Sequence, residues 1–286
     1  MEVLAAPLNP VDVAVSNGAF YGGHPELPYV PGAEVVGRVR GSGEVVWAFG
    51  AGFGLARNGG MAELTVVPEE RLVPVPEGAD SALAGALGIA GLAGWLPFAV
   101  RTPVRAGETV LVLGATGTVG RVAVQAARLL GAGRIVAAGR SEEGLARAEE
   151  LGADTVVRLG ERFRDDLREA VGDGALTLIF DALWGEPLVA SLDVAAPRAR
   201  IVHLGQSAGP TATLESGTVR GKELELFGHS NFAVPMDVLR REYDRLVRHA
   251  AAGEIRIDVE RILLEDVATA WERQQRGEHV KLVLIP

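Results

Sequence analysis

A short segment rich in small residues gives the first chemical indication in this sequence. Residues 108–120 read Glu-Thr-Val-Leu-Val-Leu-Gly-Ala-Thr-Gly-Thr-Val-Gly, an apolar stretch followed by a turn and an amphipathic segment. This order is typical of a strand, a tight turn and a helix whose N-terminal N–H groups bind the pyrophosphate of a dinucleotide. In the G-x-G-x-x-G pattern, Gly117 and Gly120 hold the second and third glycine positions. We expect cofactor contacts from Ala115, Thr116, Gly117, Thr118 and Val119.

The residues after the next predicted strand indicate which dinucleotide binds. Gly139, Arg140 and Ser141 lie where an NAD-selective site has a carboxylate for the ribose 2′-hydroxyl. A guanidinium cannot accept a hydrogen bond from that hydroxyl, but it pairs with a 2′-phosphate. These three residues therefore predict NADPH as the cofactor. The alternative is that Arg140 is an exposed charge in front of a helix whose N-cap is Ser141.

The composition excludes several classes of function. The chain has 286 residues, 48% of them apolar, and a net charge of -9, which argues against nucleic-acid or acidic-membrane binding. It has no cysteine, so disulfides, thiol catalysis and thiolate zinc sites are absent, as suits a reducing compartment. We expect no apolar run of the roughly 20 residues that cross a bilayer. The sequence predicts a cytoplasmic protein without a membrane partner.

Two regions differ in the pattern of their predicted elements. Up to about residue 80, short β-like segments alternate with glycine and proline, at residues 28–31, 35–39, 44–49, 61–67 and 71–75. Further on, strands predicted at residues 110–113, 134–138, 154–157, 176–180, 200–204 and 224–227 alternate with helices. This alternation predicts an α/β fold with a parallel sheet covered on both faces. The end of the chain predicts helices at 236–252 and 266–276 and a strand at 281–285.

Several further segments, at residues 6–12, 27–37, 60–63, 88–92 and 203–207, make the identification more specific. With the glycine loop they resemble the medium-chain dehydrogenase/reductase superfamily, and within it the zinc-free quinone oxidoreductase (zeta-crystallin-like) branch. The resemblance implies a doubly wound Rossmann domain at residues 91–231 and a GroES-like β-rich substrate domain at 1–90 and 232–286. Family members usually begin earlier, so it also implies a GroES-like domain that lacks its first strands.

The resemblance bears on the metal as well. Zinc-dependent relatives have Gly-His-Glu where this chain has Gly32, Ala33 and Glu34. The five histidines show no metal-type spacing such as i, i+4 on a helix. We therefore expect no catalytic zinc.

The expected chemistry is hydride transfer from NADPH to a quinone or to the β-carbon of a conjugated carbonyl. The resemblance implies that Asn9 lies near the nicotinamide, and Tyr21 could offer a phenol to the substrate. On sequence alone, Asn9 could equally be a turn former beside a proline, and Tyr21 a surface aromatic. Further cofactor contacts are expected after the fifth and sixth strands of the parallel sheet, from Gly205, Ser207, Asn231 and Phe232. No general acid is identified, since the tyrosine that several relatives have five residues after this asparagine is replaced by Ala14.

Other functions remain open at this point. The chain could be an NADPH-binding structural or regulatory protein with little turnover, or a relative of zinc-type alcohol dehydrogenases that has lost its metal. A short-chain dehydrogenase is excluded, because Tyr243 is followed four residues later by Val247 and not by lysine. Pairing through residues 224–227 at the edge of the parallel sheet predicts a homodimer. The expected partners are thus a small-molecule substrate and a second copy of the chain.

Overall fold

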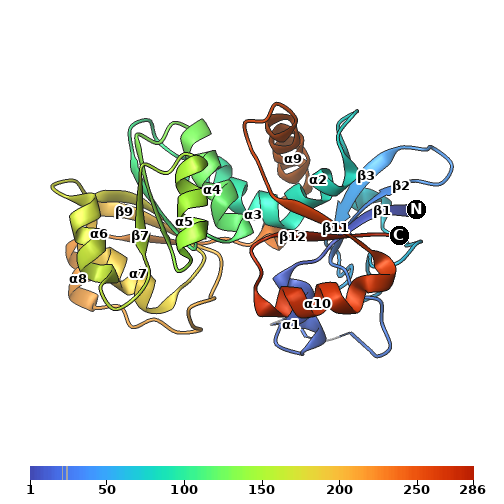
Figure 1. Cartoon of the computed structure of the whole chain (residues 1–286), viewed down its shortest axis with the longest axis horizontal. Coiled ribbons are helices and arrows are strands. Elements are labelled where there is room, and N and C mark those ends of the chain that lie inside the picture. The colour runs from blue at the N-terminus through green and yellow to red at the C-terminus, as the bar shows by residue number, and fades with distance from the viewer. Residues whose placement is uncertain (21, 24) are drawn as a thin grey trace. The chain divides into compact units, whose positions relative to one another are not determined.

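The computed structural model describes residues 1–20, 22–23 and 25–286. Tyr21, the proposed phenol, lies outside the described residues. The chain forms two compact units (Figure 1). Unit 1 comprises Met1–Leu92, Val234–Gly253 and Ile257–Pro286, and unit 2 comprises Ala93–Ala233 and Glu254–Arg256.

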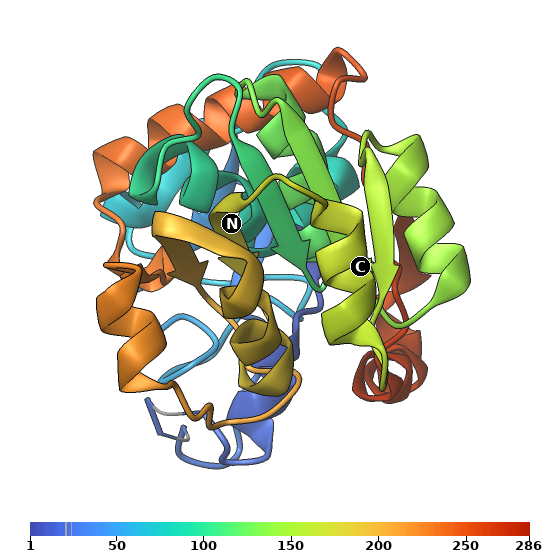
Figure 2. The same ribbon diagram turned by 90° about the vertical axis from the view of Figure 1, so that its left-hand side faces the viewer.

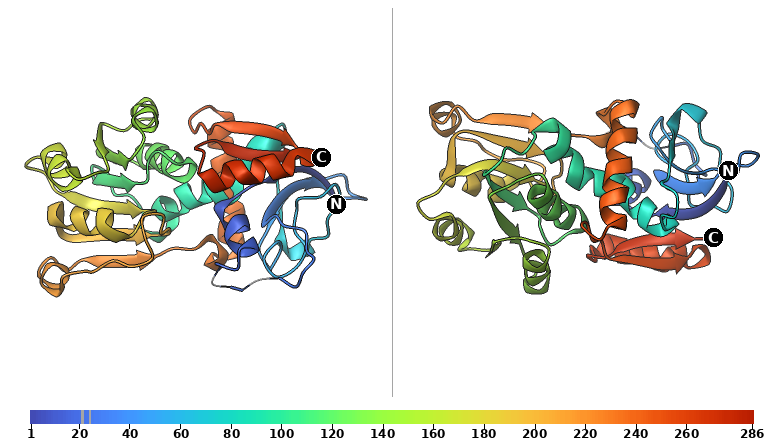
Figure 3. Two further views of the ribbon diagram at one scale, coloured as in Figure 1. Left: turned by 60° about the horizontal axis from the view of Figure 1, so that its bottom comes forward. Right: turned by 90° about the horizontal axis from the view of Figure 1, so that it is seen from above.

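Unit 1 is built on a six-stranded sheet in the order β11-β12-β1-β2-β3-β4. The strands are β1 (Glu2–Pro7), β2 (Glu34–Arg38), β3 (Val45–Phe49), β4 (Leu72–Pro74), β11 (Val259–Leu263) and β12 (Lys281–Ile285). Only β11 and β12 are parallel to each other, so the sheet is mixed, in agreement with the expected β-rich domain. Because β1 pairs with β12, the two ends of the chain lie side by side in unit 1 (Figure 3).

Two strands predicted in this region are wrong. At residues 28–31, Pro28 and Pro31 supply no N–H, and the segment is instead held by a hydrogen bond from the Val30 N–H to Asn58 Oδ1 (2.9 Å). Residues 61–67 form a single bridge, between Leu64 and Glu2. Strands β1 and β11 were not predicted from the sequence, because their pairing depends on partners distant in the chain.

The helices of unit 1 cover its sheet and close its core. They are α1 (Pro10–Ser16), η1 (Glu69–Arg71), α2 (Ser81–Ala86), η2 (Leu87–Gly91), α9 (Met236–Ala251), η6 (Leu264–Asp266) and α10 (Val267–Arg276). The fully buried Tyr243 of α9 donates a hydrogen bond to the carbonyl of Ala84 in α2 (2.9 Å). Its ring also stacks on Trp47 of β3 at 4.7 Å, so α9 is fixed against both α2 and the sheet.

Unit 2 contains the predicted parallel sheet, in the order β10-β9-β8-β5-β6-β7. Its strands are β5 (Thr109–Leu113), β6 (Arg134–Gly139), β7 (Thr155–Arg158), β8 (Leu176–Asp181), β9 (Ala195–His203) and β10 (Glu225–Gly228), and all six run parallel. Numbered along the chain, this is the order 3-2-1-4-5-6 in reverse, that of the dinucleotide-binding Rossmann fold. The expected fold class is confirmed.

Helices lie on both faces of the parallel sheet, as Figure 2 shows. They are α3 (Leu92–Leu96), η3 (Pro97–Arg101), α4 (Thr118–Leu129), α5 (Glu142–Glu150), α6 (Phe163–Val171), α7 (Gly185–Ser191), η4 (Leu192–Val194), α8 (Ser216–Gly221) and η5 (Asn231–Ala233). The central strand β5 has only buried residues from Val110 to Leu113, as expected of a strand covered on both sides.

One helical run, Ser81–Arg101, is long and apolar enough to cross a membrane, contrary to the expectation from sequence. However, 72% of its most apolar window is buried inside the protein. The run comprises α2, η2, α3 and η3, and it is interrupted at Gly88, whose ψ of -107° is not helical. We interpret it as a helix of the protein core.

Close packing of α3 against α4 gives a first prediction. A Cβ added at the buried Gly94 would lie 2.6 Å from the Val119 carbonyl oxygen and 2.8 Å from Val122 Cβ. Gly94→Ala should therefore destabilise unit 2 by about 1–3 kcal/mol in urea unfolding, because two helices must move apart. The control is Gly217→Ala, in the exposed helix α8, where an added Cβ meets nothing within 4 Å. Equal stabilities of the two variants would contradict the prediction.

Candidate functional site

The loop between β5 and α4 has the backbone geometry of a phosphate-binding turn. A Cβ at Gly120 would lie 2.1 Å from the carbonyl oxygen of Gly114, so only glycine allows the helix to approach the loop this closely. The first hydrogen bond along α4 runs from the Arg121 N–H to the Gly117 carbonyl (2.9 Å). The N–H groups of Thr118, Val119 and Gly120 therefore precede this ladder at the positive end of the helix dipole. These groups fit a pyrophosphate.

Two other residues of the loop shape it from within. The N–H of the buried Ala115 donates to the Ala138 carbonyl (2.9 Å), which fixes the loop to β6. The side chain of Thr116 is buried against β6 and α5, where a Cβ at Gly139 would lie 2.2 Å from Thr116 Cγ2 and one at Gly144 2.7 Å from Thr116 Cβ. Glycine at both positions makes room for this threonine, and Ala115 and Thr116 thus position the loop.

The end of β6 presents an exposed guanidinium. Among the residues described in the structure, none forms a hydrogen bond or ion pair with the Arg140 side chain. The nearby Glu142 is paired with Arg158 at 2.7 Å. Ser141 Oγ accepts a hydrogen bond from the Gly144 N–H (3.1 Å) and caps α5. Arg140 is thus available to an anionic ligand, while the hydroxyl of Ser141 already serves as a helix cap.

The predicted residues after β9 lie in a loop of unit 2, and those after β10 lie in the short helix η5. Gly205 packs on the preceding loop, where an added Cβ would lie 2.7 Å from the Ala182 carbonyl oxygen. The exposed Ser207 donates a hydrogen bond to that same carbonyl (3.3 Å). Asn231 is buried, with its Oδ1 3.0 Å from His229 Nε2, whereas Phe232 is 37% exposed. Gly205 and Ser207 follow the carboxyl end of β9, where ligands bind in such sheets.

A histidine and an aspartate that the sequence did not single out meet at this edge. His203 Nδ1 lies 2.8 Å from Asp181 Oδ2, at the ends of the paired strands β9 and β8. Asp181 is fully buried, and its Oδ1 accepts hydrogen bonds from the N–H groups of Leu183 (3.0 Å) and Trp184 (2.9 Å). The imidazole also packs on the Trp184 ring at 4.2 Å. Carboxylate and indole together fix the orientation of the imidazole.

Unit 1 holds a buried polar cluster around Asn9 and Glu34, both fully enclosed. Asn9 Nδ2 donates to Glu34 Oε1 (2.8 Å), and Lys281 Nζ donates to Asn9 Oδ1 and to the Leu8 carbonyl (2.8 Å). Glu34 Oε2 accepts from Trp47 Nε1 (2.9 Å) and from the Ile89 N–H (2.7 Å). The amide of Asn9 therefore bridges a carboxylate and an ammonium, and its role near the nicotinamide stays a prediction.

A second carboxylate, Asp12, joins this cluster. It accepts hydrogen bonds from the N–H groups of Asn9 and Ala33, each 2.8 Å long, and so fastens the start of α1 to the segment before β2. Burial raises the pKa of Asp12 to about 6, against the opposing effects of these two hydrogen bonds and of Lys281. Burial likewise raises the pKa of Glu34 and lowers that of Lys281. Each charge is costly to bury, and the lysine compensates the carboxylates.

Glycine at position 88 makes the Glu34 contacts possible. A Cβ there would lie 2.0 Å from Glu34 Oε2 and 2.4 Å from Trp47 Nε1. Trp47 also stacks on Phe49 at 5.5 Å, and both rings are buried. These aromatic side chains belong to the core of unit 1.

The surroundings of Ala33 show whether a zinc ion could bind there. Its side chain is buried without any donor atom, beside Glu34, whose carboxylate oxygens already accept three hydrogen bonds. Within residues 1–20, 22–23 and 25–286, no three histidine, aspartate or glutamate side chains gather as metal ligands would. The residues present at this position do not fit a zinc ion.

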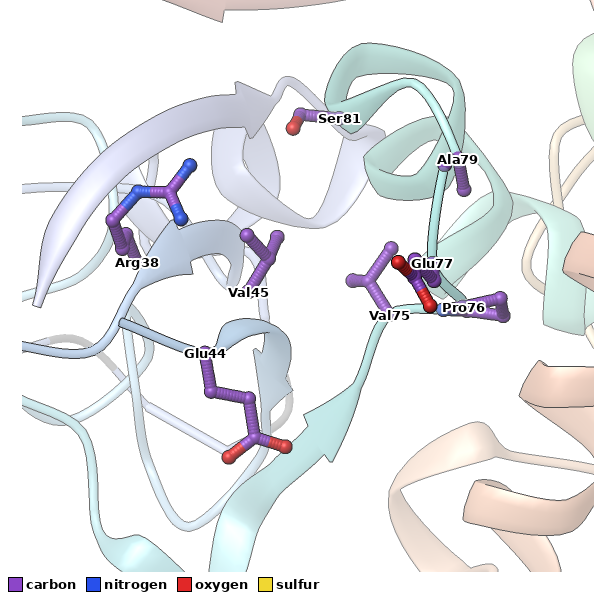
Figure 4. Close-up of a pocket in the computed structure, with 9 residues that line it drawn as sticks. Arg38, Glu44, Val45, Val75, Pro76, Glu77, Ala79 and Ser81 are labelled. Carbon is purple, nitrogen blue, oxygen red and sulfur yellow. The ribbon is translucent and has the colours of Figure 1, made fainter. Parts of the chain in front are cut away.

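A surface pocket in unit 1 is unrelated to these residues. Figure 4 shows it between the β2–β3 hairpin and the segment that enters α2. It is lined by Arg38, Glu44, Val45, Val75, Pro76, Glu77, Gly78, Ala79 and Ser81. None of the predicted site residues lines this pocket.

Lys281 is buried in unit 1 and bonded to Leu8 and Asn9. Lys281 lies in an apolar strand at the end of the chain, and the sequence there did not indicate that this lysine bonds to Asn9. His203 could have been found by asking which of the five histidines ends a predicted parallel strand.

Two family models match the chain. One, described as an alcohol dehydrogenase GroES-like domain, matches residues 1–77, and the other, a zinc-binding dehydrogenase, matches residues 118–251.

Individual proteins and solved structures are also similar to this chain. Quinone oxidoreductase from Mus musculus is 32% identical over 237 residues, which span 80% of this chain and 70% of that protein. For the rodent quinone oxidoreductases the matched share of their own length is 63% to 70%. Among solved structures, a quinone oxidoreductase from Pseudomonas syringae pv. Tomato DC3000 has a TM-score of 0.85 at 26% identity, covering 100% of this chain and 90% of its own. A structure of an NAD-dependent alcohol dehydrogenase has a TM-score of 0.87 at 26% identity, with the same coverage.

The buried cluster leads to a second prediction. Lys281→Met should lower the free energy of unfolding by about 3–5 kcal/mol at neutral pH, because it leaves Glu34 and Asp12 buried without a counter-charge. Burial raises the pKa of both carboxyls, so each takes up its proton at a higher pH in the folded protein than in the unfolded chain. Protonation removes the negative charge that Lys281 compensates, so the loss should grow as the pH rises above about 6, the folded pKa of Asp12, and should shrink below it. Urea unfolding at several pH values measures this effect.

The matched control is Arg40→Met, which removes an ion pair with Glu2 that is exposed on both sides. That variant should lose at most about 1 kcal/mol, with little dependence on pH. A Lys281→Met variant no less stable than Arg40→Met would show that the lysine does not compensate the buried carboxylates.

Proposed function

This chain belongs to the medium-chain dehydrogenase/reductase superfamily, among its quinone oxidoreductase-like members, and from that premise we propose that it transfers a hydride from NADPH to a quinone or to the β-carbon of a conjugated carbonyl. The observation that carries the proposal is the glycine loop of unit 2 followed by the unpaired, exposed Arg140. The loop fits a pyrophosphate, and the guanidinium fits the 2′-phosphate that distinguishes NADPH from NADH.

The residues assigned to the cofactor have separate tasks. The N–H groups of Thr118 and Val119 would bind the pyrophosphate, with Gly117 leaving room for it, while Gly139 makes room for the Thr116 side chain that shapes the loop. Arg140 would pair with the 2′-phosphate. Gly205, Ser207, Asn231 and Phe232 would border the nicotinamide half, where Asn231 is already held by His229. When bound, NADPH supplies the hydride, and the protein supplies position and electrostatics.

We propose that the reaction proceeds without a catalytic metal. The chain has no cysteine, and Ala33 replaces the histidine that zinc-dependent relatives use. Glu34 is fully engaged with Asn9, Trp47 and Ile89. An acceptor that needs no metal to polarise it, such as a quinone or an enone, matches this arrangement better than an alcohol.

The proposed function is tested by turnover with a chelator present. After treatment with EDTA, the purified protein should oxidise NADPH when 1,2-naphthoquinone or a simple enone is added. The loss of NADPH absorbance at 340 nm measures the rate. Undiminished rates after chelation would support the metal-free reaction. Tight NADPH binding without oxidation would instead favour a structural or regulatory NADPH-binding protein and reject the enzyme.

Cofactor choice rests on Arg140. Arg140→Gln should weaken NADPH binding by about 10-fold or more and leave NADH binding unchanged, because the lost contact is a charge-assisted pair with the 2′-phosphate. Isothermal titration with both nucleotides measures this difference. Arg162→Gln, on an exposed residue paired with Asp166, is the control and should change neither affinity. If wild-type protein binds NADH as tightly as NADPH, the assignment of Arg140 fails.

We also propose a cytoplasmic homodimer. Strand β10 forms one edge of the parallel sheet, and its Leu226 is 50% exposed. An exposed edge strand with an apolar side chain can pair with its copy across a two-fold axis. Sedimentation equilibrium tests the dimer, and a monomer at micromolar concentration would reject it.

A further inference from the structure

The proton required by the proposed reaction has no donor so far. Tyr21 lies outside the described residues, and Asn9 is enclosed in hydrogen bonds to Glu34 and Lys281. The His203–Asp181 pair is unused by the residues assigned to the cofactor. Its geometry is that of an acid–base pair, because a buried carboxylate holds one ring nitrogen and leaves the other facing away.

The unengaged nitrogen of His203 is open to a ligand. Asp181 occupies Nδ1 at 2.8 Å, and in the part of the chain that the structure describes no group is bonded to Nε2. The side chain is 27% exposed, so solvent can replace a proton that it gives away. Trp184, with its unusual φ of +60°, packs on one face of the imidazole. The ring therefore has a fixed orientation, and its Nε2 is accessible to a ligand.

The register of the sheet places this pair beside the glycine loop. Leu113 of β5 is paired with Asp181 of β8, which is paired with His203 of β9. Two inter-strand steps amount to roughly 10 Å, so His203 ends its strand about that far from the start of the loop at Gly114. All three strands point their carboxyl ends to the same edge.

Strand order then tells which half of a dinucleotide would reach His203. The order reverses between β5 and β8, and a dinucleotide lies across that point with one half over each half-sheet. Arg140, at the end of β6, lies on the β5-β6-β7 side and would hold the 2′-phosphate of the adenosine half. The nicotinamide half would then lie over β8-β9-β10, the half-sheet in which β9 is the middle strand and ends in His203.

Few charged groups surround the imidazole. Asp181 is the charge that faces it from β8. From the β10 side, the His229 N–H donates to the His203 carbonyl (2.8 Å), while the His229 ring is bonded to Asn231. Arg101 donates to the neighbouring Gly228 carbonyl (3.0 Å) and packs over Phe227. Asp181 thus has the only direct contact with the ring among the charged side chains described.

From this geometry we propose that His203, oriented by Asp181, is the proton donor of the reaction, an inference that rests on the proposed function. The acceptor gains a hydride with its electron pair from NADPH, which leaves as NADP+, and negative charge develops on the acceptor oxygen. The Nε2 proton of the imidazolium passes to that reduced acceptor. His203 is left neutral, with its Nδ1 proton still bonded to Asp181, and regains a proton from water. Asp181 is a positioning residue that fixes the tautomer.

The first test measures the tautomer in the protein without nucleotide. The ¹⁵N resonances of His203, assigned by their loss in His203→Asn, should show the neutral ring protonated at Nδ1. Asp181→Asn should shift the proton toward Nε2, because the new amide can still accept from the Leu183 and Trp184 N–H groups but can turn a donor toward the ring. A neutral ring already protonated at Nε2 in the wild type would overturn the proposal.

The second test measures turnover and binding together. His203→Asn should lower kcat with 1,2-naphthoquinone by about 100-fold or more while leaving the Kd for NADPH unchanged. It should also change the dependence of kcat on pH, because the proposed proton donor is lost with the imidazole. Asp181→Asn should lower kcat less than His203→Asn does. The control is His279→Asn, the same change at an exposed position, which should behave as wild type.

The possible results distinguish a failure of the His203 assignment from a failure of the proposed function. If the wild type turns over and His203→Asn matches it in kcat and pH profile, His203 is not the donor and the proposed function stands. If His203→Asn instead weakens NADPH binding with kcat unchanged, the histidine is a binding residue and the proposal is overturned. If the wild type reduces no acceptor, the proposed function fails and the proton donor fails with it.

Discussion

The parallel register of β5, β8 and β9 is the constraint on which the candidate chemistry of unit 2 depends. It aligns Leu113, Asp181 and His203 in one row, so that three loops separated widely in sequence leave the sheet at one edge. Because each strand is hydrogen-bonded on both sides and its central residues are buried, the row cannot slip without exposing the core. The glycine loop, the carboxylate and the imidazole are therefore held by backbone pairing rather than by contacts of their own.

In unit 1, the main constraint is the burial of charged side chains. Asn9 connects Glu34 to Lys281, and Asp12 ties two backbone segments together, with every polar atom of these carboxylates engaged. Such a cluster adds little net stability compared with an apolar core, but losing one partner is costly. Its members come from α1, β2, β3 and β12, so it fixes how these elements meet. At the position where the resemblance implies a metal ligand in zinc-dependent relatives, this chain has the methyl group of Ala33.

Small residues decide close approach in both units. Gly120 lets α4 pack on its loop, Gly94 lets α3 pack on α4, and Gly88 leaves room for the Glu34 carboxylate and the Trp47 indole. In each case a single added methyl group would meet backbone or a buried polar atom. The close packing around the proposed cofactor loop thus depends on glycine residues as well as on the side chains next to them.

The sequence by itself determined the fold class, the strands of the parallel sheet and the position of the glycine loop, because these follow from local periodicity and from turn residues. It also indicated Arg140, which a fixed offset from the loop identifies. Tertiary structure decided the rest. Lys281 became the partner of Asn9 across 272 residues of chain, and Asp181 met His203 only through strand pairing. Contacts between distant segments leave no periodic trace in either segment, so only the folded chain reveals them.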